Sequence, residues 1–128
     1  MIHASPVQPR EPDKDLVGRN GERAALAAYR QRGYRLIARN WRCSLGELDL
    51  VLAGPGTVVF CEVKARTSAA LGGPHEAVSP SKQRRLRTLA EAFLRSRPLP
   101  ARSYRFDVAS VLLRPGGGTD VHLFEDAF

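Results

Sequence analysis

The alternation of apolar and polar residues predicts most of this chain as helices and strands. Apolar residues at helical spacing favour a helix from Asp15 to about Arg32, which Gly33 ends. Ser79-Pro80 opens a second helix, which Pro98 ends. Runs rich in valine, leucine and aromatic residues predict strands at 34–43, 47–53, 57–65 and 104–113, with 121–124 as a candidate for a short last strand.

This order of elements predicts an α/β fold with a mixed central sheet flanked by helices. The expected core order is α-β-β-β-α-β. Residues 1–14 hold three prolines and almost no large apolar side chains, so we expect a disordered tail before one domain over 15–128. The glycine-rich connection 66–78 is longer than a domain of this size usually carries without a use for it.

The charge of the chain indicates the class of partner. Twenty lysines and arginines against thirteen aspartates and glutamates give a net charge of +7. Such a balance favours a polyanionic partner, most often nucleic acid, although ribosomes, anionic lipid or no such partner fit the composition equally. No apolar run is long enough to span a bilayer and no signal-peptide pattern opens the chain, so we expect a cytoplasmic protein without a membrane partner. Cys43 and Cys61 lack the spacing of a zinc knuckle or a disulfide framework.

The hairpin predicted over residues 47–65 carries charged side chains where a plain hairpin needs few. The turn over residues 54–57 sets a register that places Asp49 opposite Glu62, with Lys64 one step further along the same face. Directly opposed residues have Cβ atoms about 4.5–5.5 Å apart. The same alternation places Glu47, Asp49 and Val51 on one face of the first strand, and Leu48, Leu50 and Leu52 on the other.

Two carboxylates that converge at one point suit a hard divalent cation such as Mg²⁺ or Mn²⁺. Asp49 and Glu62 would be its ligands, and the backbone carbonyl of Val63 can supply a further oxygen. Lys64 can then hold or help deprotonate the attacking water, or neutralise charge on a phosphate. The alternative is a surface hairpin whose acids and lysine form ordinary salt bridges.

Glu22 lies, by its spacing, on the apolar face of the first predicted helix together with Leu26 and Tyr29. A carboxylate on such a face needs a partner. The metal site is one candidate. A salt bridge with an arginine, or a favourable charge near the helix N-terminus, is the other.

Basic side chains gather at the start of the second helix, where the helix dipole already favours phosphate. We expect Lys82 to face the sheet and the site, and Gln83, Arg84 and Arg87 to be more exposed. Phosphate contacts would position nucleic acid without reading its sequence, whereas the alternative is a solvated helix face. The candidates for nucleic-acid contact are Lys82, Gln83, Arg84, Arg85 and Arg87 on this helix, together with Arg19, Arg39, Arg42, Arg66 and Ser44.

Three further residues are assigned to structure. Asp107 is expected to be a strand residue paired with an arginine, Cys61 to point into the core, and Trp41 to pack in the core or at its edge.

Asp49, the run Glu62-Val63-Lys64 and a preceding helix that bears Glu22 together resemble the PD-(D/E)xK nuclease superfamily. Within it the chain is most similar to the YraN-type family of small bacterial proteins, related to archaeal Holliday-junction resolvases. That resemblance covers about residues 16–128 and rests on GRNGE, ARNWR, GELDLV, VFCEVKAR, SPSKQRRL, RFDVASV and the terminal DAF. Leu48 departs from the pattern, since the superfamily often has proline before the metal-binding aspartate.

The resemblance implies a restriction-endonuclease-like fold and a metal-dependent endonuclease that hydrolyses DNA phosphodiester bonds. Asp49 and Glu62 would bind Mg²⁺ or Mn²⁺, Lys64 would assist the attacking water, and Glu22 would complete the site. Branched or damaged DNA is the expected substrate by analogy with the resolvases, and junction cleavage would suit a homodimer. The alternatives are a nucleic-acid-binding module of DNA repair or processing with little or no catalysis, and a basic structural partner in a larger assembly.

Overall fold

The computed structural model describes residues 14–67 and 77–128 of the chain. It confirms the predicted α/β fold and core order, and it adds the last strand as a full element. The expected tail over 1–14, except Lys14, and most of the connection 66–78 lie outside the described residues. The elements are α1 (Lys14–Gln31), β1 (Arg35–Cys43), β2 (Gly46–Gly54), β3 (Thr57–Arg66), α2 (Pro80–Ser96), β4 (Ser103–Leu113) and β5 (Thr119–Phe124).

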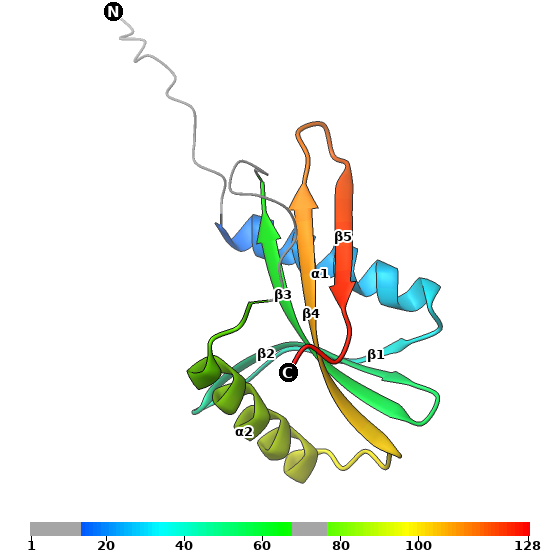
Figure 1. Cartoon of the computed structure of the whole chain (residues 1–128), viewed down its shortest axis with the longest axis vertical. Helices are drawn as coiled ribbons and strands as arrows, with labels where there is room; N and C mark the ends of the chain where they lie inside the picture. The colour runs from blue at the N-terminus through cyan, green and yellow to red at the C-terminus, as the bar shows by residue number, and fades with distance from the viewer. Residues whose placement is uncertain (1–13, 68–76) are drawn as a thin grey trace, which may run out of the picture.

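The five strands form one mixed sheet in the order β1-β2-β3-β4-β5 (Figure 1). Neighbouring strands are antiparallel except for β3 and β4, which are parallel. A parallel pair needs a crossover connection, and α2 lies within it. β1 and β5 are the edge strands, and Arg35, Arg39 and Arg42 are exposed along β1.

Two hydrophobic clusters lie on the two sides of the sheet, one against each helix. Cys61 belongs to the α1 cluster and is 3% exposed, which confirms its predicted place in the core. Trp41 packs edge-on against Phe93 of α2 with ring centroids 5.4 Å apart, as a packing residue should. The α1 cluster contains Ala25, Leu26, Tyr29, Leu50, Leu52, Val59, Cys61, Ala109 and Val111, and the α2 cluster contains Leu48, Val51, Val58, Phe60, Leu86, Leu89, Ala90, Phe93 and Phe106.

The β2–β3 hairpin has the predicted register near its turn. Gly54 pairs with Thr57, and the ladder continues in step to Leu50 opposite Cys61. Gly56 takes a φ of +71°, a conformation that glycine adopts without steric cost. The described ladder ends at this pair, one step before the predicted pairing of Asp49 with Glu62.

Side-chain alternation along β2 breaks at Asp49. Leu48 packs in the α2 cluster but Leu50 and Leu52 pack in the α1 cluster, so the prediction that these three leucines share a face is wrong. On the neighbouring strand Asn40 has a φ of +51°, and its position is skipped in the β1–β2 ladder. Asparagine tolerates this left-handed conformation better than most residues. Regular alternation therefore fails at the point where the acids lie.

Asp107 confirms its predicted structural role, because it is fully buried and paired with Arg105. Arg105 donates to both carboxylate oxygens at 2.8 and 2.9 Å, and the Tyr29 hydroxyl donates at 2.6 Å. The backbone N–H of Asp126 adds a fourth bond at 2.9 Å. Burial raises the pKa of the Tyr29 hydroxyl, so it remains a donor. This network joins α1, β4 and the segment after β5.

Gly21 allows α1 to approach β3 closely, since a Cβ there would lie only 2.4 Å from the Cβ of Ala65. Gly21→Ala is expected to push α1 off the sheet, displace Glu22 and lower the free energy of unfolding by about 1–3 kcal/mol. Gly18→Ala is the matched control, because a Cβ there meets nothing within 4 Å. It should stabilise the helix by up to about 1 kcal/mol. Urea denaturation measures both, and effects of the same sign would contradict the close approach.

Candidate functional site

Three carboxylates converge between α1 and β2. The ligand atoms of Glu22, Glu47 and Asp49 all lie within 4.8 Å of one another, and each residue is partly buried. Glu22 therefore faces the site, as the metal-site alternative required. Glu47 was not predicted as a site residue, although its place two residues before Asp49 on one strand was the available signal.

Hydrogen bonds from neighbouring elements hold each of these carboxylates. Each bond engages one carboxylate oxygen, so the second oxygen can serve another ligand. The left-handed turn at Asn40 places its side chain against α1. The bonds run from Asn40 Nδ2 to Glu22 Oε2 at 3.0 Å, from Arg42 Nε to Glu47 Oε2 at 3.2 Å, and from the Val63 backbone N–H to Asp49 Oδ2 at 2.9 Å.

Burial and mutual repulsion make the charges of these acids unfavourable. Burial, and then the charge of Glu62, raises the pKa of Asp49 from 3.8 to about 7, although the Val63 N–H bond opposes this. Glu22 and Glu47 add further repulsion. Burial also raises the pKa of Glu22. A cation bound among these oxygens would relieve the repulsion.

Glu62 lies close enough for its charge to act on Asp49, but its carboxylate pairs with α2. Lys82 Nζ is 2.5 Å from Glu62 Oε1, which confirms that Lys82 faces the sheet. Asp49 and Glu62 thus act on each other through their charges, as their predicted closeness requires, and the structure adds that Asp49 also groups with Glu22 of α1 and that Glu62 pairs with the lysine of α2.

Lys64 follows Glu62 on β3 and donates from Nζ to the backbone carbonyl of Ala77. Burial, and then the positive charge of Lys82, lowers the pKa of Lys64, while Glu62 opposes the shift. A lowered pKa increases the fraction of the amine that is uncharged, and only the uncharged form can accept a proton. Its role toward water stays a prediction.

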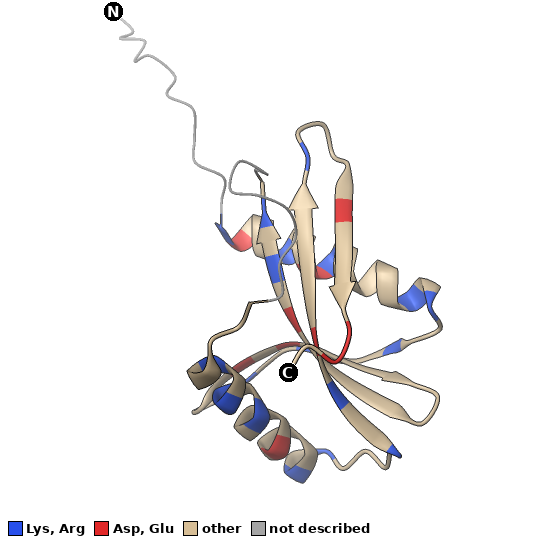
Figure 2. Cartoon of the chain, in the orientation of Figure 1, with Lys and Arg blue, Asp and Glu red and all other residues tan. Residues whose placement is uncertain are grey.

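Positive side chains lie on both sides of the acids. Arg19 and Arg39 act on Glu22 through their charges, and Arg42 contacts Glu47. On the other side, Figure 2 shows basic positions along most of α2, and acidic positions on the strands near the middle of the molecule. Arg84 and Arg85 are exposed on α2, and Ser44 is exposed in the turn between β1 and β2.

Three other side chains that are predicted to contact nucleic acid also pack against, or are partly buried in, the rest of the fold. The Arg87 guanidinium carbon lies 4.8 Å from the ring centroid of Phe106, while the residue remains exposed. Gln83 Nε2 donates to the carbonyl of Val78 at 2.9 Å. The Nε of Arg66 is buried and has no hydrogen-bond partner among residues 14–67 and 77–128. Contact of these residues with nucleic acid stays a prediction.

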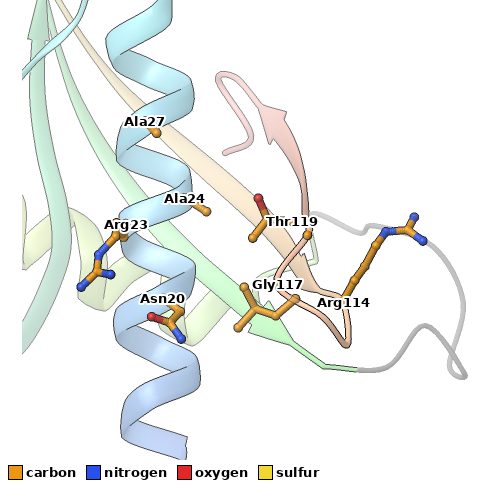
Figure 3. A pocket seen from close by; sticks show the side chains of 9 residues that line it. Asn20, Arg23, Ala24, Ala27, Arg114, Gly117 and Thr119 are labelled. Atoms are coloured by element: carbon orange, nitrogen blue, oxygen red, sulfur yellow. The ribbon is translucent and has the colours of Figure 1, made fainter.

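A pocket of about 440 Å³ lies away from the acids, between α1 and the β4–β5 turn (Figure 3). In Figure 3 the guanidinium groups of Arg23 and Arg114 point away from the space between helix and turn. Arg114 is paired with Asp120. The described residues that line this pocket include no acid, whereas three acids converge between α1 and β2. Within the described residues, neither helix is long and apolar enough to cross a membrane.

The chain matches known proteins over most of its length. A relative from Moorella thermoacetica is 49% identical over 96 residues, covering 75% of this chain and 80% of the relative. One from Nocardia farcinica is 44% identical over 107 residues, 84% of each chain. One from Pelobacter propionicus is 40% identical over 126 residues, covering 97% of this chain and 90% of the relative. All three carry the name UPF0102 protein.

Residues 21–111 match the sequence model of that family. The matched region contains the three converging acids, Glu62 and both lysines beside it. The chain therefore belongs to the family described as "Uncharacterised protein family UPF0102".

Proposed function

We propose that this protein is a divalent-metal-dependent endonuclease that hydrolyses phosphodiester bonds of DNA. The observation that carries the proposal is the convergence of Glu22, Glu47 and Asp49 within 4.8 Å. Glu62 and Lys64 lie on the adjacent strand, and arginines flank the acids. This arrangement agrees with what the PD-(D/E)xK resemblance implies.

The donor set fits a hard cation, since Glu22, Glu47 and Asp49 offer only carboxylate oxygens. These three residues would hold Mg²⁺ or Mn²⁺, with Glu62 and the Val63 carbonyl beside them. When bound, such a cation supplies Lewis-acid chemistry, since it neutralises charge on a phosphate and makes a water more acidic.

The chain's own residues would position the water and the phosphate. Lys64, whose pKa is lowered, would accept a proton from the attacking water as its oxygen forms a bond to phosphorus. The bond from phosphorus to the leaving oxygen breaks, and that oxygen takes a proton from solvent. Val63 keeps Asp49 in place through its N–H bond. Arg19, Arg39 and the basic residues in the N-terminal half of α2, from Lys82 to Arg87, would hold the flanking phosphates.

Branched or damaged DNA is the substrate that we propose, by analogy with the resolvases. Positive side chains on two sides of the acids could hold two arms of a branched molecule. The expected contacts are with phosphates. They would fix the position of the DNA but would not select its sequence. A second copy of the chain would supply the second cut at a junction.

The test is a cleavage assay on linear, single-stranded and four-way-junction DNA with Mg²⁺, Mn²⁺ or EDTA. We expect cutting that needs the metal, stops in EDTA and is lost in Lys64→Ala. Arg95→Ala removes a positive charge from an exposed position at the far end of α2 and should leave cutting intact. Binding without cutting in every condition would support the binding module instead, and no binding even at low salt would favour the structural partner.

A further inference from the structure

Glu62 interacts with two charged neighbours, a lysine that attracts it and an aspartate that repels it. Its carboxylate is 2.5 Å from Lys82 Nζ, and its side chain is only 11% exposed. Its negative charge is also the second largest cause of the raised Asp49 pKa. A nearly buried carboxylate needs a cationic partner. Glu62 can therefore satisfy that need either from α2 or from a cation among the other acids.

We propose that Lys82 is a built-in counter-ion that holds Glu62 while the site contains no divalent cation, and that cation binding draws Glu62 to the site and frees Lys82 for a DNA phosphate. This inference rests on the proposed function. The exchange of Lys82 for a divalent cation would be the step that prepares the site for DNA.

The alternative lysine is already engaged elsewhere. Lys64 lies on the same strand as Glu62, yet its Nζ donates to the Ala77 carbonyl. Among the described residues Lys82 is thus the cation in direct contact with Glu62, and Lys64 acts on Glu62 only through its charge. The two lysines repel each other, as the effect of Lys82 on the pKa of Lys64 shows. Release of Glu62 to a divalent cation would allow Lys82 to move away from this repulsion.

Lys82 can reach both positions. It lies in the first turn of α2, where Ser79 caps the helix by accepting the Lys82 backbone N–H at 3.2 Å. Its side chain is 43% exposed, and its four-carbon stem is flexible. The helix dipole favours a phosphate at this end. One rotation of the side chain would exchange a carboxylate partner for a phosphate partner, and the capped backbone would stay fixed.

The first measurement is Mn²⁺ affinity, by calorimetry in the absence of DNA, of the wild type, Lys82→Met and Arg84→Met. Both variants lose one positive charge from the same turn of α2, but only Lys82 pairs with Glu62. Lys82→Met should bind Mn²⁺ about fivefold more tightly, because Glu62 is released from its counter-ion. Arg84→Met should change the affinity by less than about twofold, because the exposed Arg84 acts on the site only through a charge that solvent and salt screen.

Equal Mn²⁺ affinities in the two variants would overturn the exchange and leave the proposed function standing. No Mn²⁺ binding by the wild type would contradict the proposed function itself.

A second measurement uses the wild-type protein and does not depend on how a variant folds. The Lys82 ζ-ammonium resonance is followed by NMR during a Mg²⁺ titration. We expect it to lose the signature of an ordered ion pair as the site fills. A resonance that stays unchanged at saturating Mg²⁺ would overturn the exchange.

Discussion

Asp49→Asn is expected to lower metal-dependent DNA cleavage by about 10³-fold or more. The substitution keeps the shape of the side chain and an oxygen that can accept the Val63 N–H, but it removes the charge at the centre of the acid cluster. The measurement is kcat/KM for junction DNA at saturating Mg²⁺. Glu91→Gln loses the same charge from an exposed position on α2 and should retain full activity.

The same substitution should change how stability depends on pH. Because burial and Glu62 raise the pKa of Asp49 from 3.8 to about 7, the folded protein binds this proton more tightly than the unfolded chain. The resulting stabilisation is complete below pH 3.8 and is lost as the pH rises through about 7. Without divalent cations, the wild type should therefore lose stability between about pH 4 and pH 7.

Asp49→Asn cannot ionise, so its free energy of unfolding should fall less over that pH range and exceed the wild-type value at the alkaline end. Urea denaturation at both pH values measures this. Parallel pH profiles for the two proteins would contradict the raised pKa. A variant that is more stable but no longer cleaves DNA would show that the repulsion among these acids destabilises the fold and is needed for cleavage.

Asp107→Ala is expected to lower the free energy of unfolding by about 3–5 kcal/mol, the usual effect of removing one partner from a buried ion pair. The substitution leaves Arg105, the Tyr29 hydroxyl and the Asp126 N–H without their shared acceptor. Since a domain of this size has only about 5–15 kcal/mol in total, much of its stability would be lost. Urea denaturation followed by far-UV circular dichroism measures the loss.

Asp120→Ala is the matched control, because Asp120 also accepts from an arginine, Arg114, at an exposed site on the same strand pair. It should lose only a small fraction of what Asp107→Ala loses, since solvent screens the pair. Similar losses in both variants would show that the buried network is not the main tie between α1, β4 and the segment after β5.

The elements of this fold were predictable because their signals are local. Ser79-Pro80 starts α2 through a cap and a fixed backbone angle, and the four-residue turn sets the β2–β3 register out to Leu50 opposite Cys61. Asp107 was assigned to a structural pair because a charge within an apolar strand needs a partner. Family membership, expected from the ordered motifs, is confirmed, whereas the relation to PD-(D/E)xK nucleases stays a prediction.

The candidate site was predicted less completely, because strict alternation holds only within a regular ladder. Asn40 takes a left-handed conformation, and the three leucines around Asp49 divide between two clusters. Nothing local in the sequence specifies that break. At that break Glu47 joins Asp49 and Glu22 in the acid cluster. The ion pair between Glu62 and Lys82 joins β3 to α2. Its geometry depends on how α2 packs on the sheet, and the local sequence does not specify that packing.

The position of β1 at the edge of the sheet has a consequence for solubility. An exposed edge strand offers unpaired backbone groups to other chains, and charged side chains along it discourage such aggregation. Arg35, Arg39 and Arg42 are exposed on β1, so Arg39 and Arg42, which are also proposed to contact nucleic acid, would help to protect the edge. Replacing them to test DNA binding would remove this protection as well. Sedimentation of each variant would show whether lost binding reflects a lost contact or a protein that self-associates through β1.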